Sequence, residues 1–146
     1  MIELWGALII LIACPVLGAL PIIGWITYAL KGRQLSQIGT KNISVSAAFY
    51  HGGTWVGILA VLSEAIKGIA AVLLSRVFFP EGSVWELIAL IALVLGRYGV
   101  GRGAGTTNVV WGFIVHDPLV AIFTSLLAII SFTLLQSKLL VKFGVL

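Results

Sequence analysis

Long apolar segments dominate this chain and limit what it can fold into. Mainly apolar residues occupy 4–30, 54–79, 85–100, 106–115 and 119–135. A helix that crosses the hydrocarbon core of a bilayer needs roughly 20 such residues. The chain is 60% hydrophobic and 10% charged, whereas soluble domains carry about 25% charged residues. Because a small globule cannot bury so much apolar surface, the sequence predicts an all-α integral membrane protein.

The expected architecture is a single membrane domain over residues 1–146, a polytopic bundle of about five transmembrane helices at the five apolar segments. Pro15 and Pro21 lie in the first segment, and proline removes a helix hydrogen bond, so we expect that helix to be bent. The fourth segment is about half a span long. It can form a re-entrant half-helix or the end of a kinked helix, since broken backbone is tolerated inside protein or beside water.

Loop charge predicts the orientation of the bundle. One set of loops holds seven cations and no acids: Lys31, Arg33, Lys41, Arg97, Arg102, Lys138 and Lys142. The other set holds one cation and four acids: Glu3, Arg76, Glu81, Glu86 and Asp117. By the positive-inside rule, we expect a multi-pass protein of the inner (plasma) membrane. Its N-terminus is expected outside, and the 31–53 loop and the C-terminus in the cytoplasm.

The 31–53 loop is the first polar cluster. It is cationic and rich in hydroxyl groups, and it has no acidic residue. Backbone N–H groups near glycines, together with Lys and Arg, bind phosphate well. The other interpretation is a positive anchor that only sets orientation. The net charge of +4 favours anionic lipid headgroups as partners, and the chain has no basic helix or aromatic motif that would indicate nucleic acid.

Two further polar clusters interrupt the apolar segments. Glu64 and Lys67 are three residues apart on one face of the second helix. Charges inside a membrane usually face a cavity or a partner, so the two can form a structural pair, or Lys67 can face a cytoplasmic cavity while Glu64 orients it. The third cluster, 96–108, places Arg97 and Arg102 among alternating glycines. It lacks the ending of a P-loop.

The remaining reactive groups indicate neither a metal nor a cofactor. Cys14 lies alone in the first apolar segment, and His51 and His116 are far apart in the sequence. Such a set does not make a metal site. His51 borders the cationic loop, where it is either a base or phosphate donor, or a solvated residue.

The order of the motifs in this chain resembles the order of motifs in one enzyme family. A proline in the first helix precedes a glycine-rich polar loop, then Glu64-x-x-Lys67-Gly68, then the glycine-rich 96–108 segment. This order is similar to that of the bacterial acyl-phosphate-dependent glycerol-3-phosphate acyltransferases, the PlsY family. Positions that fall in register with the family motifs without a gap are Gly39, Asn42, Gly53, Gly57, Lys67 and Gly68, and Pro21 matches the proline of the family's first helix. The match covers about 15–76 well and 96–118 more loosely.

The chain looks like a shortened and diverged member of that family. Thr40, Ser46 and Glu64 stand where the family has Ser, Thr and Asp. Other departures from the family pattern are Ala19, Lys41, Ser44, Ala47, Tyr50 and Arg97. The lysine of the G-G-K-G motif is absent, and Arg102 lies close enough to replace it as a cation.

The resemblance implies transfer of a fatty acyl group from acyl-phosphate to the 1-hydroxyl of sn-glycerol-3-phosphate. The product would be lysophosphatidic acid, for phospholipid biosynthesis. The expected catalytic residues are Ser46, Glu64 and Lys67. The expected phosphate-binding residues are Gly39, Thr40, Lys41, Asn42, Lys67, Arg97 and Arg102. Both substrates and membrane lipids are the implied partners, without a metal or cofactor.

Two other functions fit the sequence. A catalytically silent relative would bind an anionic lipid or a partner membrane protein, which Tyr50 at the family's Arg position favours. A small transporter or channel subunit is compatible with Glu64 and Lys67 inside a span, although no motif defines a pore.

Overall fold

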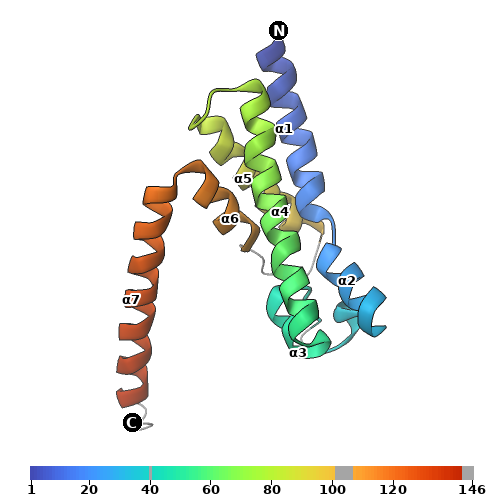
Figure 1. The fold of residues 1–146 in the computed structure, drawn as a ribbon, viewed down its shortest axis with the longest axis vertical. Coiled ribbons are helices and arrows are strands. Elements are labelled where there is room, and N and C mark those ends of the chain that lie inside the picture. Colours follow the sequence, from blue (N-terminus) through green and yellow to red (C-terminus); the bar gives the residue numbers. More distant parts are fainter. Residues whose placement is uncertain (40, 101–106, 143–146) are drawn as a thin grey trace.

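The computed structural model describes residues 1–39, 41–100 and 107–142, and these residues form helices and connecting segments without a β-strand. The fold is therefore all-α, as predicted. The helices are α1 (Ile2–Ala19), α2 (Ile22–Lys31), the short 3-10 helix η1 (Leu35–Gln37), α3 (Val45–Gly52), α4 (Thr54–Phe78), α5 (Val84–Val100), α6 (Thr107–His116) and α7 (Pro118–Lys142). Figure 1 shows their arrangement.

Three helical segments among the described residues are long and apolar enough to cross a membrane: Ile2–Lys31, Thr54–Phe78 and Pro118–Gln136. Helices α5 and α6 have 17 and 10 residues, which is less than the roughly 20 residues of a typical membrane-spanning helix. The integral membrane class is thus supported by three apolar spans, and the count of about five remains a prediction.

The segment expected as one bent helix over 4–30 is divided in two. Helix α1 continues through Pro15 and ends at Ala19, and α2 begins at Ile22. Pro21 has no N–H to continue the hydrogen-bond ladder of α1, and the Leu20 backbone is extended. The break leaves backbone carbonyls at this point without helical partners.

The segment 31–53, expected as the cytoplasmic loop, contains two short helices that were not predicted, η1 and α3. The Ser44 side chain starts α3 by accepting a hydrogen bond from the Ala47 N–H at 3.1 Å, the usual role of serine at a helix N-cap. Ala48 of α3 and Leu35 of η1 are then buried with Ile23, Val56 and Ala60 in one apolar core. This burial supplies the reason for a polar segment to fold onto the bundle.

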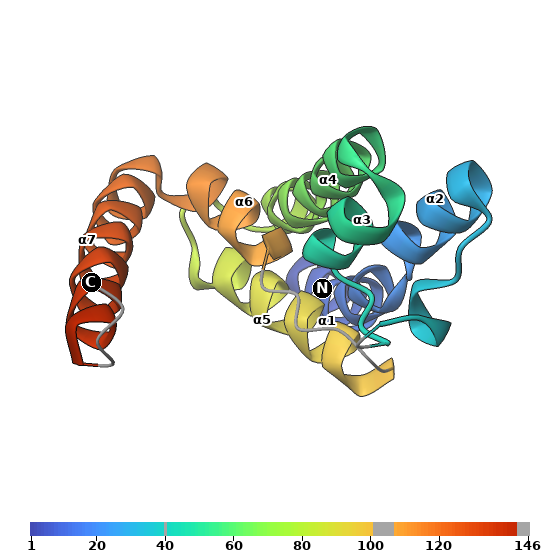
Figure 2. The ribbon, with the colours of Figure 1, turned by 90° about the horizontal axis from the view of Figure 1, so that it is seen from below.

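Helix α4 is the centre of the bundle and contacts α1, α2, α3, α5 and α6 (Figure 2). Helix α1 packs against α5 in a second apolar core that includes Ile10, Cys14 and Leu93. Two glycines allow this packing: a Cβ at Gly18 would clash with the Leu93 carbonyl, and one at Gly96 with the Pro15 carbonyl. Small residues are common where membrane helices approach so closely.

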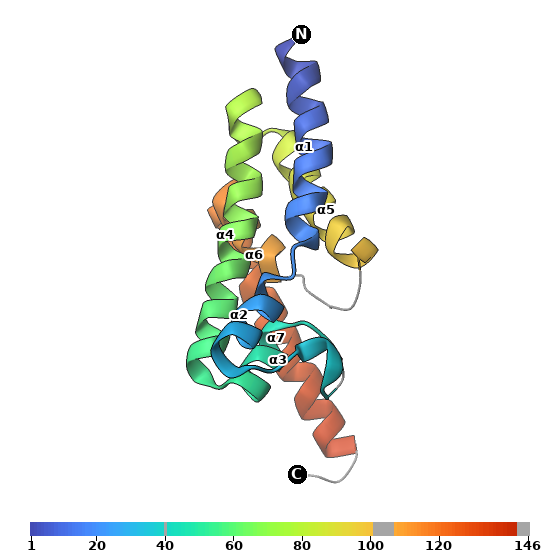
Figure 3. The ribbon, with the colours of Figure 1, turned by 90° about the vertical axis from the view of Figure 1, so that its right-hand side faces the viewer.

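The two ends of the bundle differ. Helices α2, η1 and α3 lie together at the end reached by the C-terminal turn of α1, whereas the α4–α5 connection lies at the other end (Figure 3). Among the residues that the structure describes, helix α7 packs only against α6, and it stands apart from the other helices in Figures 1 and 2. Most of its described apolar side chains are exposed, which suits a helix surrounded by lipid.

Candidate functional site

A cavity of about 550 Å³ opens between the 39–44 segment and α3. We call this cavity the loop pocket. It is lined by Gly39, Asn42, Ser44, Ser46, Ala47, Tyr50 and His51. Its lining residues carry hydroxyl, amide and imidazole groups, and the exposed Lys41 precedes Asn42 in the chain. Hydrogen-bond donors combined with a nearby cation are suited to an anion such as phosphate.

Backbone conformation shapes one wall of the loop pocket. Gly39 has φ +57°, and a Cβ there would lie 2.7 Å from Nε2 of His51, so glycine allows the imidazole to pack against the backbone. Lys41 also has positive φ, at 60°, which is uncommon for a residue with a side chain. Nη1 of Arg33 donates a hydrogen bond to the His51 carbonyl at 3.3 Å and so joins the segment after α2 to α3.

Three charged side chains meet inside the bundle, and we call Glu64, Lys67 and Arg97 the interior cluster. Their exposed fractions are 1%, 1% and 8%. Oε1 of Glu64 lies 3.5 Å from Nζ of Lys67 and 3.3 Å from Nη1 of Arg97. Two cations share one carboxylate, so the formal charge of the interior cluster is +1. Buried charge is costly unless it is paired, so the excess positive charge favours a nearby anion.

Each of the two cations also donates a hydrogen bond to a backbone carbonyl. Nζ of Lys67 donates to the Leu20 carbonyl at 2.5 Å, and Nη2 of Arg97 donates to the Ile43 carbonyl at 2.5 Å. Leu20 lies at the break between α1 and α2. Ile43 is the residue after Asn42, which lines the loop pocket. The interior cluster therefore holds both the helix break and the loop pocket against α4.

The structure sorts the predicted site residues into two groups. Gly39, Asn42 and Ser46 line the loop pocket. Glu64, Lys67 and Arg97 form the interior cluster. Lys41 is exposed beside the loop pocket, and Thr40 and Arg102 lie outside the described residues.

Sequence reasoning missed the backbone acceptors of the interior cluster. The carbonyls of Leu20 and Ile43 carry no signal in the side-chain pattern, although Pro21 indicates that carbonyls are freed nearby. Ser44 was noted as a departure from the family pattern, and its role as the cap of α3 was not predicted. It can be recognised in retrospect because serine before an apolar stretch is a common helix start.

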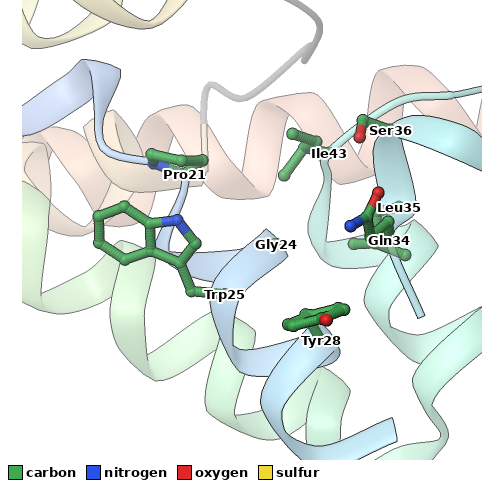
Figure 4. A pocket seen from close by; sticks show the side chains of 8 residues that line it. All are labelled: Pro21, Gly24, Trp25, Tyr28, Gln34, Leu35, Ser36 and Ile43. Carbon is green, nitrogen blue, oxygen red and sulfur yellow. The ribbon is translucent and has the colours of Figure 1, made fainter. Parts of the chain in front are cut away.

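A second cavity lies at the break between α1 and α2. It measures about 320 Å³ and is lined by Pro21, Gly24, Trp25, Tyr28, Gln34, Leu35, Ser36 and Ile43. Figure 4 shows Trp25 and Tyr28 on α2 across from Gln34, Ser36 and Ile43 on the following segment. Ile43 thus connects this aromatic-lined cavity with the Arg97 side chain, which donates to its carbonyl.

A separate polar cluster lies at the opposite end of α4. The buried carboxylate of Glu86 accepts from Nε of Arg76 at 2.9 Å and from the Gly82 N–H at 2.8 Å, and its Oε2 lies 2.6 Å from Nδ1 of His116. Arg76 also donates to the Val115 carbonyl at 2.9 Å. These contacts join the ends of α4, α5 and α6. Neither this cluster nor any other group of three His, Cys, Asp or Glu within the described ranges is arranged to hold a metal ion.

Comparison with known proteins decides the family. The model of the glycerol-3-phosphate acyltransferase family matches residues 8–146. The chain belongs to this family. The predicted resemblance is thereby confirmed, and the glycerol-3-phosphate acyltransferase family is the context for the loop pocket and the interior cluster.

Several curated relatives carry the same description. The glycerol-3-phosphate acyltransferase of Wolbachia sp. subsp. Brugia malayi (strain TRS) is 30% identical over 106 residues, which are 68% of this chain and 55% of the relative. That of Gluconobacter oxydans (strain 621H) is 30% identical over 103 residues, 62% of this chain and 49% of the relative. Glycerol-3-phosphate acyltransferase 2 of Dehalococcoides mccartyi (strain ATCC BAA-2266 / KCTC 15142 / 195) is 28% identical over 139 residues, 88% of this chain and 66% of the relative.

The chain spans about half the length of the first of these relatives, with 55% and 49% of them covered. No solved structure matches the chain. The site must therefore be interpreted from the geometry of this chain.

Proposed function

We propose that the protein transfers a fatty acyl group from acyl-phosphate to the 1-hydroxyl of sn-glycerol-3-phosphate, giving lysophosphatidic acid. One observation carries this proposal within the family context: an anion-compatible pocket is connected through Asn42 and Ile43 to an interior cluster with a formal charge of +1. A small phosphate monoester needs such a place, while an acyl donor can reach it from the apolar surroundings.

In this proposal the loop pocket binds the phosphate of the acceptor. Ser44 and Ser46 can donate hydroxyl hydrogen bonds, and Asn42 can donate from its amide. The N-terminus of α3 adds the positive end of a helix dipole, because Ser46 lies in its first turn. Lys41 is placed to approach the phosphate from the exposed side.

The proposed reaction is a simple acyl transfer. The 1-hydroxyl oxygen attacks the carbonyl carbon of the acyl-phosphate, the new ester C–O bond forms, and the bond to the phosphate oxygen breaks. The hydroxyl proton goes to the departing phosphate. Lys67 and Arg97 would stabilise the negative charge that develops in the transition state, and Glu64 would position both cations. Holding the reactants together supplies much of the remaining rate.

The corresponding membrane arrangement places the loop pocket on the cytoplasmic side of the inner membrane. It is supported by the separation of the two polar ends of the bundle: cations predominate near the loop pocket, and Glu81, Glu86 and Asp117 lie at the other end. A water-soluble acceptor would enter from the cytoplasm. Labelling of single cysteines at Ser36 and Gly82, after Cys14 is replaced by alanine, tests this orientation in intact cells and in inverted vesicles.

The test of the function is an acylation assay. Purified protein in detergent is incubated with palmitoyl phosphate and labelled glycerol-3-phosphate, and labelled lysophosphatidic acid is measured. Ser46→Ala and Asn42→Ala are expected to lower kcat/KM by about 10²–10³, as for loss of one preorganised donor. Thr124→Ala is the matched control, because Thr124 is on α7 and donates only to its own helix. Absence of product with the folded wild-type protein would reject the proposal.

A second candidate is a silent family member that binds anionic lipid. One supporting observation is that Nζ of Lys67 already donates to the Leu20 carbonyl and pairs with Glu64 in the interior. The other is that Ala47 and the 85% exposed Tyr50 line the loop pocket. Binding to vesicles with phosphatidylglycerol, together with no acylation, would favour this candidate over the enzyme.

A further inference from the structure

Asn108, the second residue of α6, has a fully buried side chain without a hydrogen-bond partner. Within the described ranges, six buried side-chain nitrogen and oxygen atoms lack a partner, and four of them belong to Asn108, Glu64 and Arg97. They are Nδ2 and Oδ1 of Asn108, Oε2 of Glu64 and Nε of Arg97. Buried polar groups in native proteins are nearly always hydrogen-bonded, so this concentration indicates a place where a ligand is received.

The three residues come from adjoining positions on α4, α5 and α6. A Cβ at Gly68 would clash with the Asn108 carbonyl, so Asn108 lies against the turn of α4 that follows Lys67. Glu64 precedes Gly68 by four residues, which places both on the same face of α4 at roughly 5–6 Å between neighbouring turns. Arg97 of α5 reaches that face because its Nη1 is bonded to Glu64. The residues that carry the unpartnered atoms therefore lie where α4, α5 and α6 contact one another.

The hydrogen-bonding capacity of these atoms limits the class of ligand. Asn108 Nδ2 and Arg97 Nε are donors, and Asn108 Oδ1 and Glu64 Oε2 are acceptors. A phosphate needs donors, and an acyl chain needs neither. Hydroxyl groups both donate and accept, so a polyol can satisfy both kinds of atom. The balance of two donors and two acceptors thus fits a ligand that carries adjacent hydroxyl groups.

We propose that Asn108, with Glu64 and Arg97, binds the hydroxyl groups of the acceptor's glycerol backbone. This inference rests on the proposed function, because it assumes that the phosphate of the same molecule lies in the loop pocket. Arg97 joins the two parts: its Nη2 donates to the carbonyl of Ile43, the residue after Asn42 in the pocket wall. Phosphate recognition and hydroxyl recognition are thereby assigned to different side chains.

The experiment compares two phosphate monoesters that differ only in their hydroxyl groups. Binding of glycerol-3-phosphate and of n-propyl phosphate to the detergent-solubilised protein is measured by calorimetry without an acyl donor. The wild-type protein is expected to bind glycerol-3-phosphate at least about 10-fold more tightly, as expected for the gain of one or two buried hydrogen bonds. Asn108→Leu should reduce this preference to about 1 while leaving the affinity for n-propyl phosphate unchanged.

Ser75→Ala is the matched control. Ser75 is also buried on α4 and its hydroxyl also lacks a partner, but it lies two turns beyond Gly68 in the direction of Arg76. The preference for glycerol-3-phosphate should be retained in this variant. If Asn108→Leu does not fold, Asn108→Asp keeps the shape and replaces the donor by an acceptor, and it should still lower the preference several-fold.

Several outcomes would overturn the inference. Equal wild-type affinity for the two esters, or no binding of either, would mean that the buried atoms hold water only. Equal loss of both affinities in a folded Asn108 variant would assign the residue a structural role. The acylation assay is independent of these results: an Asn108-dependent preference without acyl transfer would reject the proposed function and keep the hydroxyl site, and acyl transfer without such a preference would do the reverse.

Discussion

Nη1 of Arg97 lies 3.3 Å from Oε1 of Glu64, and both side chains are buried where α5 meets α4. The same carboxylate oxygen lies 3.5 Å from Lys67. One acidic group therefore compensates two cations in the protein interior. Removing one of these three side chains should cost more folding free energy than removing one partner of an exposed ion pair.

Glu64→Gln should be strongly destabilising. The substitution leaves Lys67 and Arg97 close together without a counter-charge, and breaking a buried pair in this way costs about 3–5 kcal/mol. Unfolding in mixed detergent micelles, followed by tryptophan fluorescence, measures the change. Glu3→Gln, at an exposed position of α1, should change the free energy of unfolding by less than about 0.5 kcal/mol. Equal stability of the two variants would contradict the importance of the interior cluster.

Lys67→Met should abolish acylation of glycerol-3-phosphate while the protein still inserts into the membrane. The variant keeps the Glu64–Arg97 pair but loses the bond to the Leu20 carbonyl and the cation proposed to act on phosphate. The acylation rate and the membrane-inserted fraction are measured on the same preparation. Normal turnover in the inserted variant would remove Lys67 from the catalytic machinery.

Glu86→Gln and Glu81→Gln should separate a buried contact from an exposed one. Glu86 is fully buried and bound by Arg76, Gly82 and His116, whereas Glu81 is 76% exposed and paired only with Arg76. The first change should lower the free energy of unfolding by about 3–5 kcal/mol and the second by less than about 1 kcal/mol.

The affinity of these two variants for glycerol-3-phosphate tests where the binding site lies. The Glu86 contacts lie at the end of α4 away from the loop pocket, so neither variant should alter the affinity for glycerol-3-phosphate under conditions where it is folded. A large loss of affinity in Glu81→Gln would be inconsistent with the placement of the site.

Gly96→Ala should disrupt the packing of α1 on α5. A Cβ at Gly96 would meet the Pro15 carbonyl, and this backbone cannot move away as a side chain can. Overpacking of this kind costs about 1–3 kcal/mol or more. Gly99→Ala is the control on the same helix, because a Cβ there meets no atom within 4 Å. It should stabilise α5 by up to about 1 kcal/mol through helix propensity.

Gly39→Ala should impair the loop pocket through its contact with His51. Gly39 and Gly82 both have positive φ, at 57° and 75°, so alanine at either position is strained by about 1–2 kcal/mol. Only at Gly39 would the new Cβ meet a side chain, with Nε2 of His51 at 2.7 Å. A calorimetric titration should show weaker binding of inorganic phosphate for Gly39→Ala and unchanged binding for Gly82→Ala.

Local signals were sufficient for the outline of the fold. Long apolar segments predicted the helical membrane class, and Pro15 and Pro21 predicted a bend in the first helix, where the structure has a break between α1 and α2. The α3 helix was not predicted because polar residues such as Lys41, Asn42 and Ser44 precede it and look like loop, and its stability comes from burying Ala48 against residues of α2 and α4. This stabilisation depends on contacts with distant parts of the chain, so hydrophobic periodicity and helix propensity alone do not reveal it.

The sequence by itself determined the class, the family and the identity of the charged residues, because hydropathy, charge and motif order are properties of the chain. Only the tertiary structure decided how those charges are used. It brings Arg97 to Glu64 across 33 positions and gives both cations backbone carbonyls as partners. Contacts of this kind arise from the packing of α4 against α5 and from the break at Pro21, so residue spacing along the chain could not specify them.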